Sequence, residues 1–177
     1  MAQYQQITDD GLRRKTGARY QREIAALQQL GFRSLAPCLE VLGAFSALYQ
    51  FPVLLLTLPK REVLVFPWPL RLAVANALLC KADTPTIALC MGMGVKLYSA
   101  FTDGTLLISA TFQSHAVPSP ASAIVKSPAC LTLAQAWSTH QQAVLALQGK
   151  GKAVRTGVEF EDYIAHSRLE ENTSQYQ

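Results

Sequence analysis

The segment Val95–Phe112 constrains the fold of this chain more than any other, because it consists of two alternating runs joined by an Asp-Gly dipeptide at 103–104. A two-residue Asp-Gly connection favours a type I′ turn, in which both central residues have positive φ and glycine adopts that conformation freely. Closing the hairpin there pairs Phe101 with Leu106, and the later pairs follow from that register. One face is then apolar and the other polar, which is typical of a sheet packed on one side. The sequence therefore predicts a folded domain with an antiparallel sheet.

Further strands are expected before the hairpin. Short runs rich in apolar and β-branched residues predict strands over 53–58, 63–66, 71–80 and 86–91. With the hairpin they define a sheet region over 53–113. A stretch rich in Ser, Ala and Pro then predicts a loop over residues 114–130.

The first helix is expected over residues 7–30. Thr8 suits the N-cap, because its hydroxyl can accept a hydrogen bond from a free backbone N–H of the first turn. Gly31 suits the left-handed position that ends many helices, and Phe32 supplies the apolar contact that often follows it.

A second helix is expected over residues 132–148. Thr132 and Gln135 have the spacing of a capping box, and Gly149 is the expected terminator. Leu133, Trp137, His140, Val144 and Leu147 share one face of this helix. A short terminal helix over 158–171 and a loose tail over 172–177 complete the prediction.

The segment Val41–Leu58 has two interpretations. It holds eighteen uncharged residues between Glu40 and Lys60-Arg61, which is long enough to cross a bilayer as a helix. Its glycine, serine, glutamine and proline residues favour a soluble core instead, with a buried helix over 39–50 followed by the strand 53–58. Both interpretations remain open at this stage.

Length and composition favour a single α+β domain. The chain has 177 residues, half of them apolar, and a net charge of +4. An antiparallel sheet of about four to six strands, packed by an N-terminal and a C-terminal helix, accounts for the predicted elements. Net charge this small does not by itself indicate nucleic acid as a partner.

Cysteine usage and the N-terminus favour a cytoplasmic protein. The N-terminus is polar and has no apolar segment of the kind found in secretory signals. The four cysteines lie far apart in the sequence, which favours reduced and mostly buried thiols; they are Cys38, Cys80, Cys90 and Cys130. Neither cysteine nor histidine spacing resembles a zinc site, so no metal and no cofactor are predicted.

No catalytic residue is predicted from the sequence. No serine lies in a G-x-S-x-G elbow, and no cysteine has a recognisable catalytic signature. His140 lies on the apolar face of its helix, where a histidine is usually a packed residue with a satisfied ring nitrogen. His115 and His166 share no spacing with it.

Two surfaces are candidates for binding. The polar face of the hairpin is predicted to carry Lys96, Tyr98, Ser109 and Thr111, and a helix passing over it would bring His140 near them and leave a ligand pocket. The first helix carries a basic cluster that would suit an anionic membrane surface, unless it is a solvated helix face; its members are Arg13, Arg14, Lys15, Arg19 and Arg22. Nucleic acid is not favoured, because no RNA-binding signature accompanies the cluster.

Three pieces of the sequence together resemble a family of uncharacterised bacterial proteins. They are Leu30-Gly-Phe32 at the end of a helix, the hairpin Leu97–Ser109 with its Phe-Thr-Asp-Gly-Thr turn, and a helix carrying Trp137-Ser-Thr-His140. The resemblance spans about residues 24–145 and brings no assigned activity. It implies a bacterial domain that is sometimes associated with a membrane.

Two functional hypotheses follow. The leading one is a non-enzymatic interaction or scaffold domain, in the cytosol or at the inner face of a bacterial membrane, whose partner is another protein or a second copy of the chain. The alternative is a small-molecule binding domain or enzyme, with Lys96, Tyr98 and His140 lining a cavity between the curved sheet and the helices. Convergence of those three side chains on a pocket would favour the alternative.

Overall fold

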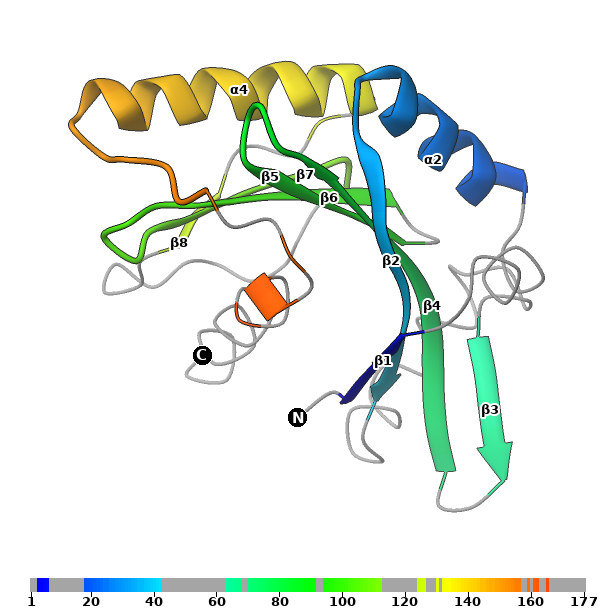
Figure 1. The fold of residues 1–177 in the computed structure, drawn as a ribbon. Coiled ribbons are helices and arrows are strands. Elements are labelled where there is room, and N and C mark those ends of the chain that lie inside the picture. The colour runs from blue at the N-terminus through cyan, green and yellow to red at the C-terminus, as the bar shows by residue number, and fades with distance from the viewer. Residues whose placement is uncertain are drawn as a thin grey trace.

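The computed structural model describes residues 3–6, 18–42, 63–67, 70–91, 94–112, 124–126, 130, 132–156, 159, 161–162 and 165. These residues form one sheet with two helices on the same face (Figure 1), so the predicted α+β architecture is confirmed. The strands are β1 (Gln3–Gln6), β2 (Arg33–Leu42), β3 (Val63–Pro67), β4 (Leu70–Lys81), β5 (Thr86–Met91), β6 (Gly94–Ala100), β7 (Leu106–Ala110) and β8 (Ile124–Lys126), and the helices are α2 (Ala18–Gln29) and α4 (Leu133–Gly149).

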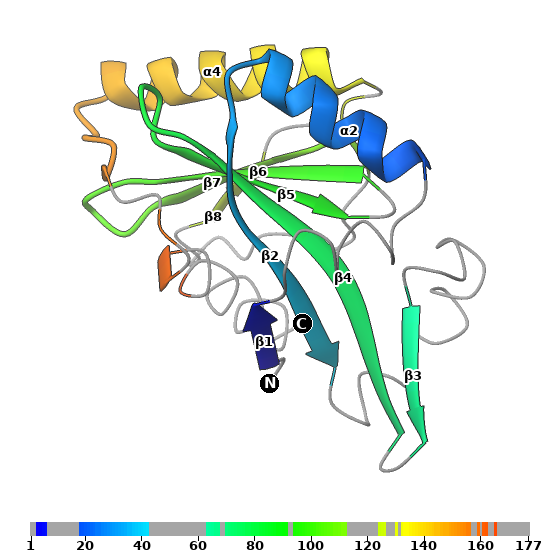
Figure 2. The ribbon, with the colours of Figure 1, turned by 45° about the vertical axis from the view of Figure 1, so that its right-hand side comes forward.

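The strand order is β1-β2-β4-β5-β6-β7-β8, and β3 also pairs with β4. All neighbours are antiparallel except β7 and β8. Strand β4 is long enough to pair with β3 near its start and with β5 near its end, while β2 runs along its other side. Strands β2 and β4 therefore extend beyond the part of the sheet that the helices cover (Figure 2).

Two sequence predictions are wrong, those of a helix over 39–50 and of a loop over 114–130. The helix expected over 39–50 does not begin at residue 39, because residues 39–42 belong to β2 and pair with β1 and β4. The loop expected over 114–130 contains strand β8 at 124–126, which pairs with β7. Residues 43–58 lie outside the described part, so most of Val41–Leu58 is not placed. Among the described residues, no helix is long and apolar enough to cross a membrane.

The predicted hairpin forms, but its turn and register differ from the prediction. The turn spans Phe101–Gly104 and is closed by a hydrogen bond from the Gly104 N–H to the Phe101 carbonyl, 3.0 Å. Among these residues only Gly104 has a positive φ, 85°. The carboxylate of Asp103 accepts a hydrogen bond from the Thr105 N–H at 3.0 Å, which holds the aspartate in a local turn. A three-residue connection ending in a left-handed glycine therefore replaces the two-residue turn, and Ala100 pairs with Leu106.

This one-residue change in register alters which side chains share a face of the sheet. Leu97 now pairs with Ser109, and Tyr98 pairs with Ile108. Both faces bury apolar side chains, so the expected polar face is wrong. Between the helices and the face of the sheet toward them lies the cluster Tyr20, Leu27, Phe32, Ala77, Leu79, Ala88, Cys90, Val95, Leu97, Ala136 and Trp137. The opposite face carries Leu78, Ile87, Leu89, Tyr98, Leu106, Ile108 and Ile124.

The ends of both helices follow from particular residues. Helix α2 ends as predicted at Gly31, whose φ is 87° and whose N–H bonds to the Gln28 carbonyl. The side chain of Thr132 caps α4 by accepting from the Gln135 N–H at 3.2 Å, as the sequence predicts. The stop of α4 comes later than predicted, because Gly151 takes the left-handed conformation, with φ 82°, and Gly149 remains helical.

Candidate functional site

His140 lies at the centre of the contact between α4 and the sheet. Its side chain is completely buried. Its Nε2 atom is 3.0 Å from Ser99 Oγ on β6, and its Nδ1 atom is 2.8 Å from Ser109 Oγ on β7. Both serines reach the imidazole because the observed register turns them toward the helices. The sequence predicts a packed histidine with one satisfied ring nitrogen, and in the structure both ring nitrogens have partners.

The hydroxyl of Ser99 is the branch point of a polar network. It donates to the Pro85 carbonyl at 3.0 Å, and its oxygen is also 3.0 Å from Thr86 Oγ1. A serine hydroxyl has a single hydrogen. Since the Pro85 carbonyl uses that hydrogen, Ser99 accepts from His140 Nε2–H. With the Ser99 hydrogen assigned to the Pro85 carbonyl, the imidazole is the Nε2–H tautomer and Nδ1 accepts from Ser109.

Burial lowers the pKa of His140 from its ordinary value of 6.5 to about 4. A charged imidazolium would lose its hydration in this site, and both of its neighbours there are neutral hydroxyls. His140 is consequently neutral at pH 7 and holds the sheet and α4 together through hydrogen bonds to uncharged partners.

Trp137 connects this network to the apolar core. Its ring lies nearly parallel to that of His140, with centroids 6.2 Å apart and an interplanar angle of 19°. It also meets the ring of Phe32 edge-on, with centroids 5.1 Å apart and an interplanar angle of 77°. The indole is thereby packed against both α2's terminal loop and the histidine, so it forms a firm wall beside His140.

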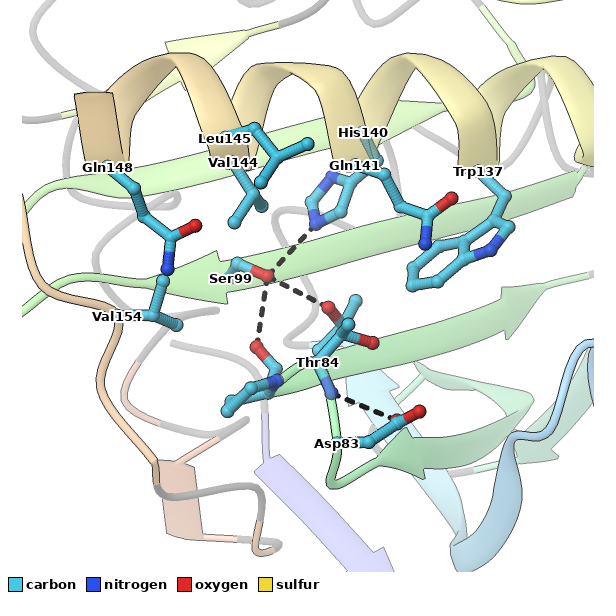
Figure 3. Close-up of a pocket in the computed structure, with 12 residues that line it drawn as sticks. Asp83, Thr84, Ser99, Trp137, His140, Gln141, Val144, Leu145, Gln148 and Val154 are labelled. Carbon is cyan, nitrogen blue, oxygen red and sulfur yellow. Dashed lines mark hydrogen bonds between the residues drawn. The ribbon is translucent and has the colours of Figure 1, made fainter. Parts of the chain in front are cut away.

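A pocket of about 260 Å³ opens beside Ser99 and His140 (Figure 3). Side chains descend to it from α4, and the turn between β4 and β5 lies opposite them. It is lined by Asp83, Thr84, Pro85, Thr86, Ser99, Trp137, His140, Gln141, Val144, Leu145, Gln148 and Val154. The mixture of an apolar wall and a few polar groups is typical of ligand pockets.

The polar side chains of the turn between β4 and β5 differ in their hydrogen bonding. The Oγ1 atom of Thr84 is buried and has no hydrogen-bond partner among the residues that the structure describes. The carboxylate of Asp83 accepts from the Thr84 N–H at 2.9 Å and lies 3.2 Å from Lys81 Nζ. Hydrogen bonding to Lys81 lowers the pKa of Asp83 below its ordinary value, so this exposed carboxylate is ionised and already paired.

The geometry argues against Ser99 as a nucleophile. Ser99 and His140 are within hydrogen-bond reach, and Ser109 orients the far side of the ring, which is the arrangement of a nucleophile, a base and an orienting group. A base, however, must accept the serine proton. When that proton is donated to Pro85, the facing nitrogen of His140 is assigned its own hydrogen and cannot accept the serine proton.

The predicted pocket residues do not form one site. Ser109 and His140 are brought together, at 2.8 Å. Tyr98 is buried in the cluster on the opposite face of the sheet. Lys96 lies on that face too, because it pairs with Leu89, which belongs to the same cluster. The hydroxyl of Thr111 accepts from the Val95 N–H at 2.9 Å, next to the hairpin.

The other predicted residues are only partly described. Arg13, Arg14 and Lys15 lie outside the described residues, as does the side chain of Arg19, while Arg22 is exposed on α2. Contact of this cluster with an anionic membrane therefore stays a prediction. Among the described cysteines, Cys80, Cys90 and Cys130 form no disulfide, and the described residues hold no cluster of three or more potential metal ligands.

Sequence reasoning missed most of the pocket. Three lining residues follow Trp137 at helical spacing, namely Gln141, Val144 and Gln148. Their place beside the apolar stripe on α4 could therefore have been predicted from the sequence. Thr84 had no such signal, because its position depends on how the turn between β4 and β5 meets α4.

Comparison with known families, curated proteins and solved structures finds no match for this chain, so its function is inferred from the site itself.

Proposed function

We propose that this chain is a small-molecule binding domain without catalytic activity, and that the pocket beneath α4 is its ligand site. One observation carries the proposal: the pocket floor is completely hydrogen-bonded, whereas Thr84 in its wall keeps a buried hydroxyl without a partner. Buried polar atoms are almost always satisfied, and an exception calls for an explanation, for which a group bound in the pocket is the one we propose.

The volume of the pocket indicates a small ligand. Ligand pockets for drug-sized molecules run from roughly 300 to 1,000 Å³, whereas this one measures about 260 Å³. A dry cavity of about 150 Å³ accepts benzene. Scaling from that case, the pocket beneath α4 holds a molecule of roughly ten non-hydrogen atoms.

The floor of the pocket supports binding rather than chemistry. Ser99 and His140 are held by hydrogen bonds that use the serine proton and both imidazole nitrogens. A group fixed in this way gives a ligand a rigid surface, and a preformed surface reduces the entropic cost of binding. Trp137 adds a wall fixed by its contact with Phe32.

A fragment screen by NMR tests this proposal. Uncharged and charged fragments of seven to ten non-hydrogen atoms would be titrated against the ¹⁵N-labelled chain. We expect saturable shifts centred on the amides of Thr84 and Gln141. The variant Val144→Phe should abolish them by filling the pocket, and Gln142→Phe, on an exposed position outside the pocket lining, should leave them unchanged.

Two results would overturn the proposal: a complete set of fragments that produces no saturable shifts at the pocket, or shifts that persist in a folded Val144→Phe variant. Labelling of Ser99 by a fluorophosphonate would contradict the non-catalytic assignment, because such reagents require an activated serine.

A second candidate is the interaction domain expected from the sequence. Leu145 lines the pocket and leaves 65% of its surface exposed, so apolar area continues beyond the pocket mouth. A side chain of another copy of the chain could use that area as an anchor. In that case light scattering would show a dimer that Leu145→Lys dissociates, and free fragments would compete with dimer formation.

A further inference from the structure

We infer that the pocket beneath α4 selects uncharged ligands that combine an apolar body with a hydroxyl or amide group, and that it rejects ions of either sign. This inference rests on the proposed function and specifies its ligand class. It follows from the balance of charge and hydrogen bonding among the lining residues.

The first step concerns charge. Of the twelve lining residues, Asp83 is the one with a formal charge, since His140 is neutral. The carboxylate of Asp83 is paired with Lys81 and bonded to a backbone N–H. Among the described residues that line it, the pocket therefore presents no unpaired charge and contains no lysine or arginine.

The second step concerns what an ion would lose on binding. An anionic ligand would give up its hydration for a site whose lining holds a carboxylate and no cation. An ammonium ligand would have to share a carboxylate that Lys81 already neutralises at 3.2 Å. Desolvating a charge without a compensating partner is strongly unfavourable, so both ions are disfavoured.

The third step concerns the polar partners that remain. The buried Thr84 Oγ1 has no partner, and a hydroxyl can both donate and accept. The amides of Gln141 and Gln148 extend from α4 toward the same space (Figure 3), and an amide likewise donates and accepts. A neutral hydroxyl or amide on the ligand matches these groups without carrying charge into the site.

The last step concerns the apolar part of the ligand. Trp137 lies at one side of the pocket, and Val144 and Val154 lie at the other. A planar or branched apolar body of six to eight carbons fits between them at a volume of about 260 Å³. The ligand class is consequently a small aromatic or branched alcohol, phenol or amide.

Four molecules of nearly equal shape test this selectivity: benzyl alcohol, toluene, benzylammonium and benzoate. Each would be titrated at pH 7 against the full chain, with dissociation constants taken from chemical-shift changes at the pocket amides. We expect benzyl alcohol to bind about fivefold more tightly than toluene and about tenfold more tightly than either ion, because a site with unpaired hydrogen-bonding groups discriminates against analogues that cannot pair with them.

Two variants assign the selectivity to particular groups. Thr84→Val keeps the shape of the side chain and removes the unpartnered hydroxyl, so it should bring the affinities of benzyl alcohol and toluene to within about twofold. Asp83→Asn removes the carboxylate and leaves Lys81 without its partner beside the pocket, so it should narrow the preference for benzyl alcohol over benzoate.

The outcomes separate this inference from the proposed function. Equal or tighter binding of benzylammonium or benzoate at the pocket would overturn the inference and leave a ligand site in place. Retention of the full alcohol preference in Thr84→Val would also overturn it. Failure of all four molecules and of the wider fragment set to bind would overturn the proposed function itself.

Discussion

Ser99→Ala and Thr84→Val should change stability in opposite directions, although both remove a buried hydroxyl from the same pocket. Ser99 Oγ contacts the Pro85 carbonyl, His140 Nε2 and Thr86 Oγ1, each at 3.0 Å. Thr84 Oγ1 contacts no hydrogen-bonding group. The two substitutions therefore separate the loss of satisfied hydrogen bonds from the removal of an unsatisfied one.

The magnitudes follow from how many partners each hydroxyl leaves behind. A buried polar group without its partner costs about 1–3 kcal/mol. Ser99→Ala leaves three such groups, on Pro85, Thr86 and His140, so even at the lower figure of about 1 kcal/mol each the loss adds up to about 3 kcal/mol. We expect a loss of about 3 kcal/mol, or a fall in Tm of roughly 6–12 °C for a chain of this size. Thr84→Val should gain about 0.5–1 kcal/mol.

Urea unfolding followed by far-ultraviolet circular dichroism measures both effects. A change in midpoint with an unchanged slope indicates altered stability rather than an altered denatured state. Ser99→Ala within about 1 kcal/mol of the parent chain would refute the network described for the pocket floor. A loss of stability in Thr84→Val as large as that in Ser99→Ala would show that the Thr84 hydroxyl has a partner in the folded protein.

Three further predictions concern pH and backbone conformation. The pKa of His140 in the folded chain, about 4, lies below the value of 6.5 in the unfolded chain, so the unfolded chain binds more protons between these values. Stability should therefore fall by about 1.4 kcal/mol per pH unit as pH decreases from 6.5 to 4, roughly 3 kcal/mol in all, and His140→Gln should remove this dependence in urea titrations at fixed pH. Gly104→Ala should destabilise the fold by about 1 kcal/mol, because φ is 85° at that position, although an added Cβ would meet no atom within 4 Å. Gly149→Ala, in the last helical position, should instead stabilise the fold by about 0.5–1 kcal/mol. Thermal unfolding of the two glycine variants compares them, and equal shifts would contradict the backbone argument. Lys152 Nζ lies 2.6 Å from Asp103 and lowers its pKa to about 2, so Lys152→Met should raise that pKa toward 3.8 in a ¹³C carboxyl titration, and an unchanged value would exclude the pair.

Local signals predicted the helix ends that depend on one or two residues. Thr132 caps α4 and Gly31 ends α2, because a hydroxyl at the N-cap and a left-handed glycine after the last turn act through neighbouring backbone groups. The end of α4 was less predictable. Gly149 and Gly151 both qualify as terminators, and the chain uses Gly151, whose neighbour Lys152 then reaches Asp103 on the hairpin.

The apolar run that begins at Val41 shows a limit of composition. A short apolar segment is compatible with a buried helix, a membrane span or a central strand. Residues 39–41 are a strand because β1 and β4 supply hydrogen-bonding partners on both sides, and those partners come from distant parts of the sequence.

The candidate site depended on the register of a single hairpin. A two-residue turn would place Tyr98 and Ser109 on one face, whereas the three-residue connection places Ser99 and Ser109 against His140. The energy difference between the two turns lies in the backbone of Asp103 and Gly104 together with the packing of both faces of the sheet. Sequence spacing cannot weigh those contributions against each other.

The sequence by itself determined the α+β class, the hairpin at 95–112, the two helices and the apolar face that buries Trp137 and His140, because each depends on side-chain periodicity or on groups within one turn of the chain. Only the tertiary structure decided that both faces of the sheet are buried, that two serines bond to His140, and that Thr84 is left with a buried and unpaired hydroxyl. These features arise where strands and a helix distant in sequence meet, and their geometry is fixed by packing rather than by any local pattern.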